Sequence, residues 1–541
     1  MTYGERTISV ALEGKTEFYD PSKYVKIKET EPSSNGYHKC DEDEGDVEGT
    51  PSRPLVPLQE TDIANGRRFV ADHGDNVRFV ADWKRWVVFD GRRWAIDESE
   101  TLVQYLAKET AIRMGVEAAQ SVADAADKAV KATGNDVDKA EANKNLKAAT
   151  AGLKHAQKTH DIRDIKRMLE SAKSERLVNV QRGRDVFDLH HHLFNAWNGT
   201  IDLRDGILRL HRREDFLTRV YPTSYRQDAL RGEYLKFLKK VFHQDPETAE
   251  YIRKLSGYVA TGETCDHLFH IFHCDGSNGK GVITLLWTSV LGEDEYAHTA
   301  PTTLLVNDGK DRHPTEKIGL RGARVAIASE SKQGGKLDES VVKNLTSEDM
   351  ITARSMGQNF YRFPPTHKFI LQTNHKPRLV GTDHGIRRRL RLVPFVAKFW
   401  KESDKKLDPT AEWDPEFQAD PTLLERPRST ESEGILADMI FQARQFYENG
   451  RRLDAPTKIV HATMEYLKDE DLIGQFFDAK VKIEPDAWLG AAEFYTAFKS
   501  WWASEGHEEK RIPSTTRFGT EAKKKFKHCV PKDTVYNVRI I

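Results

Sequence analysis

In this 541-residue chain, the residues whose types and spacing most clearly indicate a chemical function form a glycine-rich turn between two apolar segments. The segment is Leu268-Phe-His-Ile-Phe-His-Cys-Asp-Gly-Ser-Asn-Gly-Lys-Gly-Val-Ile-Thr-Leu-Leu286, and its order predicts a strand, a turn and a helix. Backbone N–H groups that converge at a helix N-terminus bind phosphate oxygens, because the helix dipole is positive there. Gly276 and Gly279 permit the backbone angles of such a turn, and Lys280 would reach the β- and γ-phosphates of a nucleotide.

The turn is an imperfect Walker A motif. Cys274 stands at the first glycine position, and Gly281 stands where a Ser or Thr normally follows the lysine. The hydroxyl that would bind Mg²⁺ is therefore missing from its usual place; water could replace it, and Thr284 is a weaker candidate. A structural turn that contains a lysine is the alternative interpretation. We expect ATP with Mg²⁺ as cofactor, bound through seven consecutive residues: Gly276, Ser277, Asn278, Gly279, Lys280, Gly281 and Val282.

Three further motifs follow the turn in the sequence, between residues 324 and 391. The apolar stretch 324–330 predicts a strand that ends in Glu330, which could polarise the attacking water or help to hold the metal. The stretch 369–374 predicts another strand, ending in Asn374, whose amide would contact the γ-phosphate or the water. The arginine cluster within 383–391 could stabilise transition-state charge on a neighbouring subunit's nucleotide.

Together these motifs resemble those of superfamily 3 helicases, in particular the phage, plasmid and poxvirus primase–helicase family. The resemblance runs from about residue 60 to the end of the chain and is sharpest between 233 and 395. Family members carry a G-x-G-x-N-G-K loop, which the chain matches at Gly276, Asn278, Gly279 and Lys280. Glu330 stands at the position of the family's motif B acid, and Asn374 at that of its motif C asparagine.

The resemblance implies a role for each of these residues. Arg388 and Arg389 align with the family's paired arginines before an apolar-Pro-Phe ending, here 393–395, and we expect Arg388 to be the arginine finger. The finger would act on the adjacent subunit's nucleotide, so the resemblance implies a homo-oligomer, a hexamer. The expected catalytic residues are Lys280, Glu330, Asn374 and Arg388, with Glu330 also the expected metal ligand.

A DNA-binding hairpin is expected between the motif B and motif C strands. The stretch 336–354 is similar to the family's B′ region, and 360–368 would form a hairpin that projects into the central channel of a ring. A cation on such a hairpin can bind a backbone phosphate, and an aromatic ring can stack on a base. The candidates for single-stranded DNA contact are Arg354, Arg362 and Lys368.

The chain is predicted to be a multidomain α/β protein. The expected domains are a disordered acidic leader at 1–58, an α+β N-terminal helicase-associated domain with a helical insertion at 59–232, a central AAA+-like superfamily 3 P-loop ATPase at 233–400, and a helical or winged-helix DNA-binding domain at 401–541.

Local patterns add detail to the N-terminal region. Residues 79–94 predict two aromatic-rich strands around a turn at Asp90-Gly91, and 101–174 predicts a helical hairpin broken at Gly134-Asn135. A basic run at 523–528, near the other end of the chain, would suit DNA contact.

Composition sets outer limits on function. The chain holds 83 Lys and Arg against 84 Asp and Glu, so its net charge of -1 says nothing about nucleic acid. No stretch approaches the ~20 apolar residues of a membrane-spanning helix. Four scattered cysteines and the absence of an apolar signal-peptide core favour a reducing, cytoplasmic location.

The predicted function is that of an ATP-dependent DNA helicase or translocase in the replication of a phage, plasmid or integrated mobile element. A nucleotide-binding initiator or scaffold with weak or no hydrolysis is the alternative, because Cys274 and Gly281 depart from the motif. Only 58 low-complexity residues precede the region of resemblance, which disfavours a primase–polymerase. A separate primase or polymerase is therefore a further expected partner.

Overall fold

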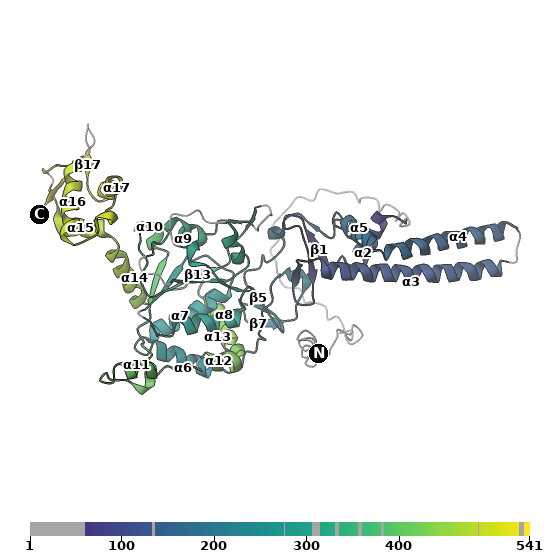
Figure 1. Ribbon diagram of the computed structural model, residues 1–541, viewed down its shortest axis with the longest axis horizontal. Coiled ribbons are helices and arrows are strands. Elements are labelled where there is room, and N and C mark those ends of the chain that lie inside the picture. Colours follow the sequence, from purple (N-terminus) through teal and green to yellow (C-terminus); the bar gives the residue numbers. More distant parts are fainter. Residues whose placement is uncertain are drawn as a thin grey trace, which may run out of the picture. The chain divides into compact units, whose positions relative to one another are not determined.

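Five parallel strands form the central sheet of the protein, seen here in a computed structural model (Figure 1). Their order is β14-β8-β13-β10-β9, and each neighbouring pair runs parallel. The strands are largely buried and apolar along their length, as expected for a parallel sheet covered on both faces. Their bounds are β8 (Phe269–His273), β9 (Ala297–Thr299), β10 (Val325–Glu330), β13 (Lys368–Thr373) and β14 (Leu390–Pro394).

The structure describes residues 60–541, except for 133–135, 275, 306–313, 331–334, 355–359, 380–383, 423, 485 and 530–534. The expected acidic leader at 1–58 lies outside the described residues.

One hydrophobic core, with members from Phe194 to Ile459, packs against one side of the sheet strands. Helix α7 lies directly against α13, and Gly257 of α7 is required there, because a Cβ atom would come within 2.4 Å of the Ala443 backbone nitrogen. This core extends across the predicted boundaries at 232 and 400, so neither boundary coincides with the edge of a core. The helices involved are α6 (Gly232–Val241), α7 (Pro246–Ala260), α8 (Lys280–Leu291) and α13 (Ser432–Glu448).

A second core includes the alternate residues of the same strands together with short elements between β9 and β14. Tyr466 and Leu467 of α14 also belong to it. The elements in this part of the chain are α9 (Glu339–Leu345), β11 (Ile351–Ala353), β12 (Tyr361–Phe363), α10 (His384–Arg387), α11 (Glu402–Leu407), α12 (Glu425–Thr430) and α14 (Thr457–Asp469).

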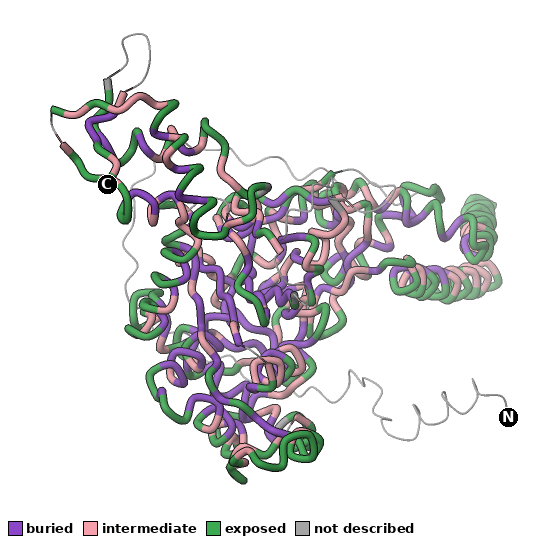
Figure 2. The backbone as a smooth tube through the Cα atoms, turned by 60° about the vertical axis from the view of Figure 1, so that its left-hand side comes forward, coloured by how far each residue is buried: buried purple, intermediate pink, exposed green. Residues whose placement is uncertain are grey.

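The N-terminal region confirms the expected turn at Asp90-Gly91 and has two helices where the hairpin was expected, while the predicted break at Gly134-Asn135 lies outside the described residues. The Asp90-Gly91 turn joins two antiparallel strands, and Trp86 and Trp94 are buried core residues. The long helices α3 and α4 lie side by side, and exposed residues dominate their surface (Figures 1 and 2). The bounds are α2 (Asp62–His73), β1 (Val77–Val80), β2 (Arg85–Phe89), β3 (Trp94–Asp97), α3 (Thr101–Lys131), α4 (Asp136–Thr159), α5 (Ile162–Ala172), β4 (Asn179–Val180), β5 (Leu193–Ala196), β6 (Gly199–Asp202) and β7 (Ile207–Arg209).

The last part of the chain has an aromatic core of its own, built from residues between Ile473 and Val538. Three helices and short antiparallel strands surround this core; the winged-helix assignment stays a prediction. The elements are α15 (Leu472–Lys480), β15 (Val481–Ile483), β16 (Leu489–Gly490), α16 (Ala491–Ser504), α17 (Thr515–Lys525), β17 (His528–Cys529), β18 (Val535–Tyr536) and β19 (Val538–Ile540).

Among the helices that the structure describes, none is both long and apolar enough to cross a membrane.

Candidate functional site

The predicted strand, turn and helix are present in the predicted order. Strand β8 ends at His273, and α8 begins at Lys280. Three residues of the intervening turn have positive φ angles: Gly276 at 112°, Ser277 at 48° and Gly279 at 86°. Gly279 is also required by packing, since a Cβ atom there would lie 2.7 Å from Val241 Cγ2. The turn therefore has the conformation that glycines at these positions favour.

The ammonium group of Lys280 lies at the carboxyl end of the sheet. Its Nζ atom donates to the Thr373 carbonyl oxygen at 2.9 Å and to Asn374 Oδ1 at 2.5 Å. It also lies 3.0 Å from Cys274 Sγ. The structure thus brings together Lys280 and Asn374, two of the predicted site residues, from segments 94 residues apart.

The first turn of α8 offers backbone donors next to this ammonium. The first N–H groups of any α-helix have no partner within the helix. Within the described part of the chain, the structure gives no hydrogen-bond acceptor to the amides of Gly281 and Val282. A Cβ atom on Gly276 would meet none of the described residues within 4 Å, so the turn is also open to them on that side. Together these groups can bind an anion.

The side chain of Cys274 accepts hydrogen bonds within the turn. It is 3% exposed, and its Sγ atom accepts a hydrogen bond from the Gly276 amide at 3.2 Å as well as from Lys280. The thiol holds the start of the turn and the lysine together, a function that a glycine at this position could not perform.

The second departure from the motif, Gly281, leaves space beside the helix. Among the described residues, the atom nearest to a Cβ there would be Gln372 Oε1, at 4.0 Å. Thr284 does not replace the missing hydroxyl in this conformation. Its Oγ1 atom lies 3.2 Å from the Lys280 carbonyl oxygen and accepts a hydrogen bond from Gln372 Nε2, and the residue is buried.

The backbones of Glu330 and Asn374 lie at the same edge of the sheet as the turn. Thr373 is in register with His273 on one side and with Glu330 on the other. Adjacent strands lie about 4.8 Å apart, so the ends of the three strands fall within about 10 Å of one another. The carboxyl edge of a parallel sheet is where ligands bind in open α/β folds.

The segment after β14 holds the turn in place, which the sequence analysis missed. The Phe399 amide donates to the Ser277 carbonyl oxygen at 2.7 Å, and Asn278 Nδ2 donates to the Phe395 carbonyl oxygen at 3.5 Å. Gln372, which binds Thr284, was also missed. These residues belong to no recognised motif. The apolar-Pro-Phe ending at 393–395 was the one sequence feature that could have indicated this segment.

The two candidate arginine fingers, Arg388 and Arg389, differ in burial. Arg389 is 7% exposed, and its guanidinium donates to Thr346 Oγ1 and to the Gly385 carbonyl oxygen. Arg388 is exposed, and among the described residues the structure gives its side chain no hydrogen-bond partner.

Arg388 lies at the opposite edge of the sheet from the turn in its own chain. It precedes β14, whose first residue pairs with Phe269, while the turn follows His273. Five strand residues at about 3.3 Å each place the two edges about 16 Å apart. Arg388 is therefore positioned away from its own chain's Lys280.

A hairpin is present between β10 and β13, but its strands differ from those expected. Strand β11 (Ile351–Ala353), inside the predicted B′ region, pairs antiparallel with β12 (Tyr361–Phe363). Arg354 follows β11, with its guanidinium 4.9 Å from the ring centroid of Phe360, and Arg362 on β12 is exposed. Both arginines thus belong to the hairpin.

The assignment of Lys368 to DNA contact is wrong. Lys368 is the first residue of β13 and is 2% exposed. Its Nζ atom donates to the carbonyl oxygens of Thr261 and Glu263 and lies 4.9 Å from the ring centroid of Tyr258. Burial, and then the nearby Arg324 guanidinium, lower the pKa of Lys368 well below its usual range. This lysine connects the amino edge of the sheet to the end of α7.

The basic run near the end of the chain is partly neutralised. Lys524 pairs with Glu521 at 2.7 Å, and Lys525 pairs with Asp478 at 2.5 Å. Its assignment to DNA contact stays a prediction.

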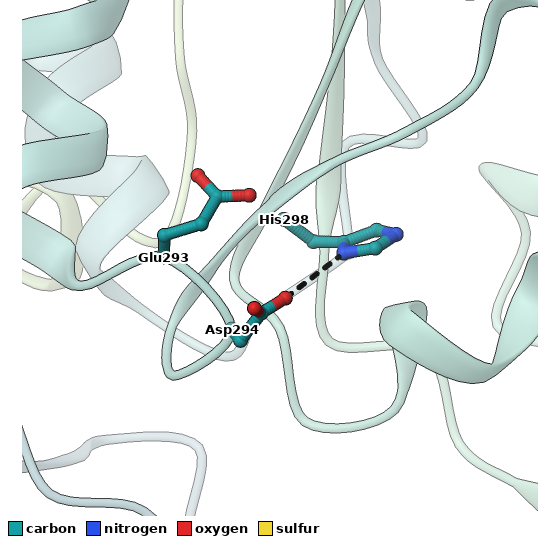
Figure 3. Close-up of side chains that lie close together, drawn as sticks. All are labelled: Glu293, Asp294 and His298. Atoms are coloured by element: carbon teal, nitrogen blue, oxygen red, sulfur yellow. Dashed lines mark ion pairs between the residues drawn. The ribbon is translucent and has the colours of Figure 1, made fainter.

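A cluster of possible metal ligands lies between α8 and β9, away from the turn. The ligand atoms of Glu293, Asp294 and His298 lie within 4.8 Å of one another, and Asp294 faces the His298 ring at 3.8 Å (Figure 3). Glu293 also accepts a hydrogen bond from the Thr299 amide at 2.9 Å. The cluster is at the amino end of β9, and its two acids are exposed, so it is no part of the nucleotide site.

Two family models match the chain. The model described as "D5 N terminal like" matches residues 66–243, and a family of unknown function, DUF5906, matches residues 272–389.

Several viral proteins are similar in sequence. "Putative helicase L207/L206" of Acanthamoeba polyphaga mimivirus is 26% identical over 325 residues, which are 59% of this chain and 33% of that protein. "Putative helicase 184R" of Invertebrate iridescent virus 6 is 24% identical over 362 residues, 62% of this chain and 37% of that protein. "Putative primase C962R" of African swine fever virus is 25% identical over 243 residues, 44% and 25% of the two chains.

The chain spans roughly a third of the length of the first two viral proteins and a quarter of the third. Among solved structures, the apo C-terminal region of NrS-1 (305–718) is similar at 12% identity with a TM-score of 0.34, over 58% of this chain and 77% of that one. By the D5 N terminal like match over residues 66–243 and the viral relatives, the chain is similar to D5-like primase–helicases.

Proposed function

We propose that the protein is an ATP-dependent DNA helicase or translocase that acts in the replication of a phage, plasmid or other mobile element. The relatives support a replication-related helicase or primase function by their names. The observation that carries the proposal is the Lys280 ammonium, which lies beside Asn374 and the open amides of α8 at the carboxyl edge of a parallel sheet.

In this proposal the turn binds the triphosphate of ATP. Lys280 exchanges its contacts with Thr373 and Asn374 for oxygens of the β- and γ-phosphates, while the amides of Gly281 and Val282 donate to the phosphates. Asn374, released from the lysine, is then free to contact the γ-phosphate or the attacking water. Glu330 is assigned as the group that orients and activates this water.

Mg²⁺ is the expected metal, and the donor set around the turn fits it in part. Glu330 is the carboxylate that the motif assigns to the metal, but its side chain lies outside the described residues; the usual hydroxyl ligand is replaced by Gly281, and Thr284 is engaged elsewhere. When bound, Mg²⁺ neutralises developing charge on the phosphates. Water molecules in its shell would take the place of the hydroxyl.

The position of Arg388 supports action between subunits. Because Arg388 lies at the far edge of the sheet from its own turn, it can reach a nucleotide only on a neighbouring copy of the chain. We therefore propose a ring-shaped homo-oligomer, a hexamer, with single-stranded DNA in its central channel. The β11–β12 hairpin, with Arg354 and Arg362, would contact the DNA.

A nucleotide-binding replication scaffold is the second candidate function. The specific observation in its favour is that Cys274 and Thr373 already satisfy the Lys280 ammonium without a nucleotide, while Gly281 supplies no hydroxyl. A multiple-turnover phosphate-release assay on the purified chain, with and without single-stranded DNA, separates the two. The motor proposal expects repeated turnover that DNA stimulates, and binding without turnover would favour the scaffold.

Restoring the missing hydroxyl is expected to improve the use of Mg²⁺. The space beside Gly281 accepts a Cβ atom, so Gly281→Ser should fold normally and add one Mg²⁺ ligand. We expect the Mg²⁺ concentration for half-maximal ATP hydrolysis to fall about tenfold, equivalent to about 1.4 kcal/mol. Gly281→Ala is the matched control, because it fills the same space without a hydroxyl. Equal Mg²⁺ dependence of the two variants would contradict the assigned role of this position.

A further inference from the structure

A groove lined by arginines and aromatic rings lies between the N-terminal region and the β11–β12 hairpin. Its volume is about 580 Å³, within the range of ligand-binding sites. Arg182 and Arg184 line one wall, and Phe360, Tyr361 and Arg362 line the other. We call this feature the arginine groove. Neither Arg182 nor Arg184 belongs to any of the sequence motifs described above.

The two walls are connected by a stacked arginine. The Arg321 guanidinium lies 4.7 Å from the ring centroid of Trp83, in the N-terminal region, and 5.7 Å from that of Tyr361 on the hairpin. The Gly183 amide, between the two groove arginines, donates to Asp82 Oδ1 at 3.0 Å. These contacts hold the loop with Arg182 and Arg184 opposite the hairpin.

The charge of the groove is positive. Asp82 is the acidic residue in its lining, and its carboxylate already accepts the Gly183 amide. Arg184 lies 3.5 Å from Asp185, whereas Arg182 and Arg362 are exposed. A partner with regularly spaced negative charges would therefore be attracted.

The aromatic side of the groove is open to solvent. Phe360 is 59% exposed, although a large apolar ring normally gains free energy from burial. Arg354 contacts this ring but does not cover it. Exposed rings among arginines are typical of surfaces that bind single-stranded nucleic acid, because unpaired bases stack on the rings while the cations bind the phosphates.

We propose that the arginine groove binds a segment of single-stranded DNA, with Arg182 and Arg184 contacting backbone phosphates and Phe360 stacking on a base. The N-terminal region is then one wall of the DNA path, and the hairpin is the other. This inference rests on the proposed function, because it concerns the DNA on which the motor would act. Duplex DNA and an acidic protein segment are the competing ligands.

The test is a fluorescence-anisotropy titration of a labelled oligodeoxythymidine with the full chain, without nucleotide, at several salt concentrations. For Arg182→Ala/Arg184→Ala we expect at least tenfold weaker binding and a log–log salt slope smaller by about 1.4, since each contact to a single strand contributes about 0.7. Lys166→Ala/Arg176→Ala, which removes two exposed cations of the same region outside the groove, should change neither quantity.

Phe360→Ala gives a readout that a merely structural role would not produce. We expect about tenfold weaker binding with an unchanged salt slope, because stacking involves no phosphate. Thermal melting of each variant checks that it is folded.

Three results would overturn the proposal, and they can be told apart. Normal binding by Arg182→Ala/Arg184→Ala together with weak binding by Arg354→Ala/Arg362→Ala would exclude the N-terminal wall but leave the proposed function standing. Tighter binding of a duplex competitor than of the single strand, lost in the same variant, would reassign the groove to duplex DNA. No binding of any DNA by the wild-type chain would remove both the groove and the motor, and leave an acidic protein as the candidate partner.

Discussion

Arg388→Ala is expected to lower the ATP turnover of the assembled protein by about 10³–10⁵-fold, the range for loss of an arginine finger. The exposed Arg388 lies at the sheet edge opposite the turn before α8, so in the proposed mechanism it would stabilise transition-state charge in a neighbouring subunit. Nucleotide affinity should change little, because the turn and Lys280 are intact. Phosphate release and binding of a fluorescent ATP analogue measure the two effects separately.

The control for Arg388 is its buried neighbour. Arg389→Ala would remove hydrogen bonds to Thr346 and Gly385 and is expected to lower the melting temperature, which Arg388→Ala should leave unchanged. Wild-type turnover by the assembled Arg388→Ala protein would show that the in-trans assignment is wrong.

Lys280→Ala is expected to lower ATP turnover by at least about 10²–10³-fold, comparable to the removal of a main donor to a transition-state oxyanion. Unlike Arg388→Ala, this variant should also bind ATP more weakly, since the ammonium contacts the phosphates before reaction. The measurement is phosphate release at saturating ATP, alongside the affinity for the analogue. Lys254→Ala, which removes an exposed lysine on α7, is the matched control. Turnover that survived in Lys280→Ala would mean that the turn does not hold the nucleotide.

Mixing the two inactive variants tests the geometry directly. An interface between an Arg388→Ala subunit, which keeps Lys280, and a Lys280→Ala subunit, which keeps Arg388, contains one complete site. We therefore expect partial recovery of turnover in the mixture after subunits exchange. Size-exclusion mass determination establishes that mixed assemblies form, and mixed assemblies without any recovery would place the two residues in separate functions.

The strand, turn and helix around Lys280 could be predicted because the residues that determine them are close together in the chain. Strand, turn, lysine and helix lie within 268–286, and positive φ angles occur at Gly276 and Gly279, as expected, and also at Ser277, which was not expected. Asn374 was also identified, since an amide after an apolar strand is visible in sequence. Its contact with Lys280 depended on the strand order, because β13 is the neighbour of β8 although 94 residues separate the two side chains.

Lys368 shows where local reasoning failed. A lysine at the start of a strand is compatible with an exposed DNA contact, and nothing nearby in the sequence indicates that carbonyl groups 105 and 107 residues away surround its Nζ atom. The arginines at 387–389 present the same problem. They are identical and adjacent in sequence, but the fold exposes Arg388 and buries Arg389. The arginine groove, formed by segments more than 150 residues apart, could not be found from spacing at all.

Sequence alone determined the strand, turn and helix around Lys280, the helical hairpin of the N-terminal region and the resemblance to a helicase family, because each depends on residues close together in the chain. Only the tertiary structure decided that Lys368 is buried, that Arg388 lies at the sheet edge opposite the turn before α8 and that Arg182 and Arg184 line one groove with the hairpin. The physical reason is that burial and the meeting of charged groups depend on how strands are ordered and packed, which no short segment specifies.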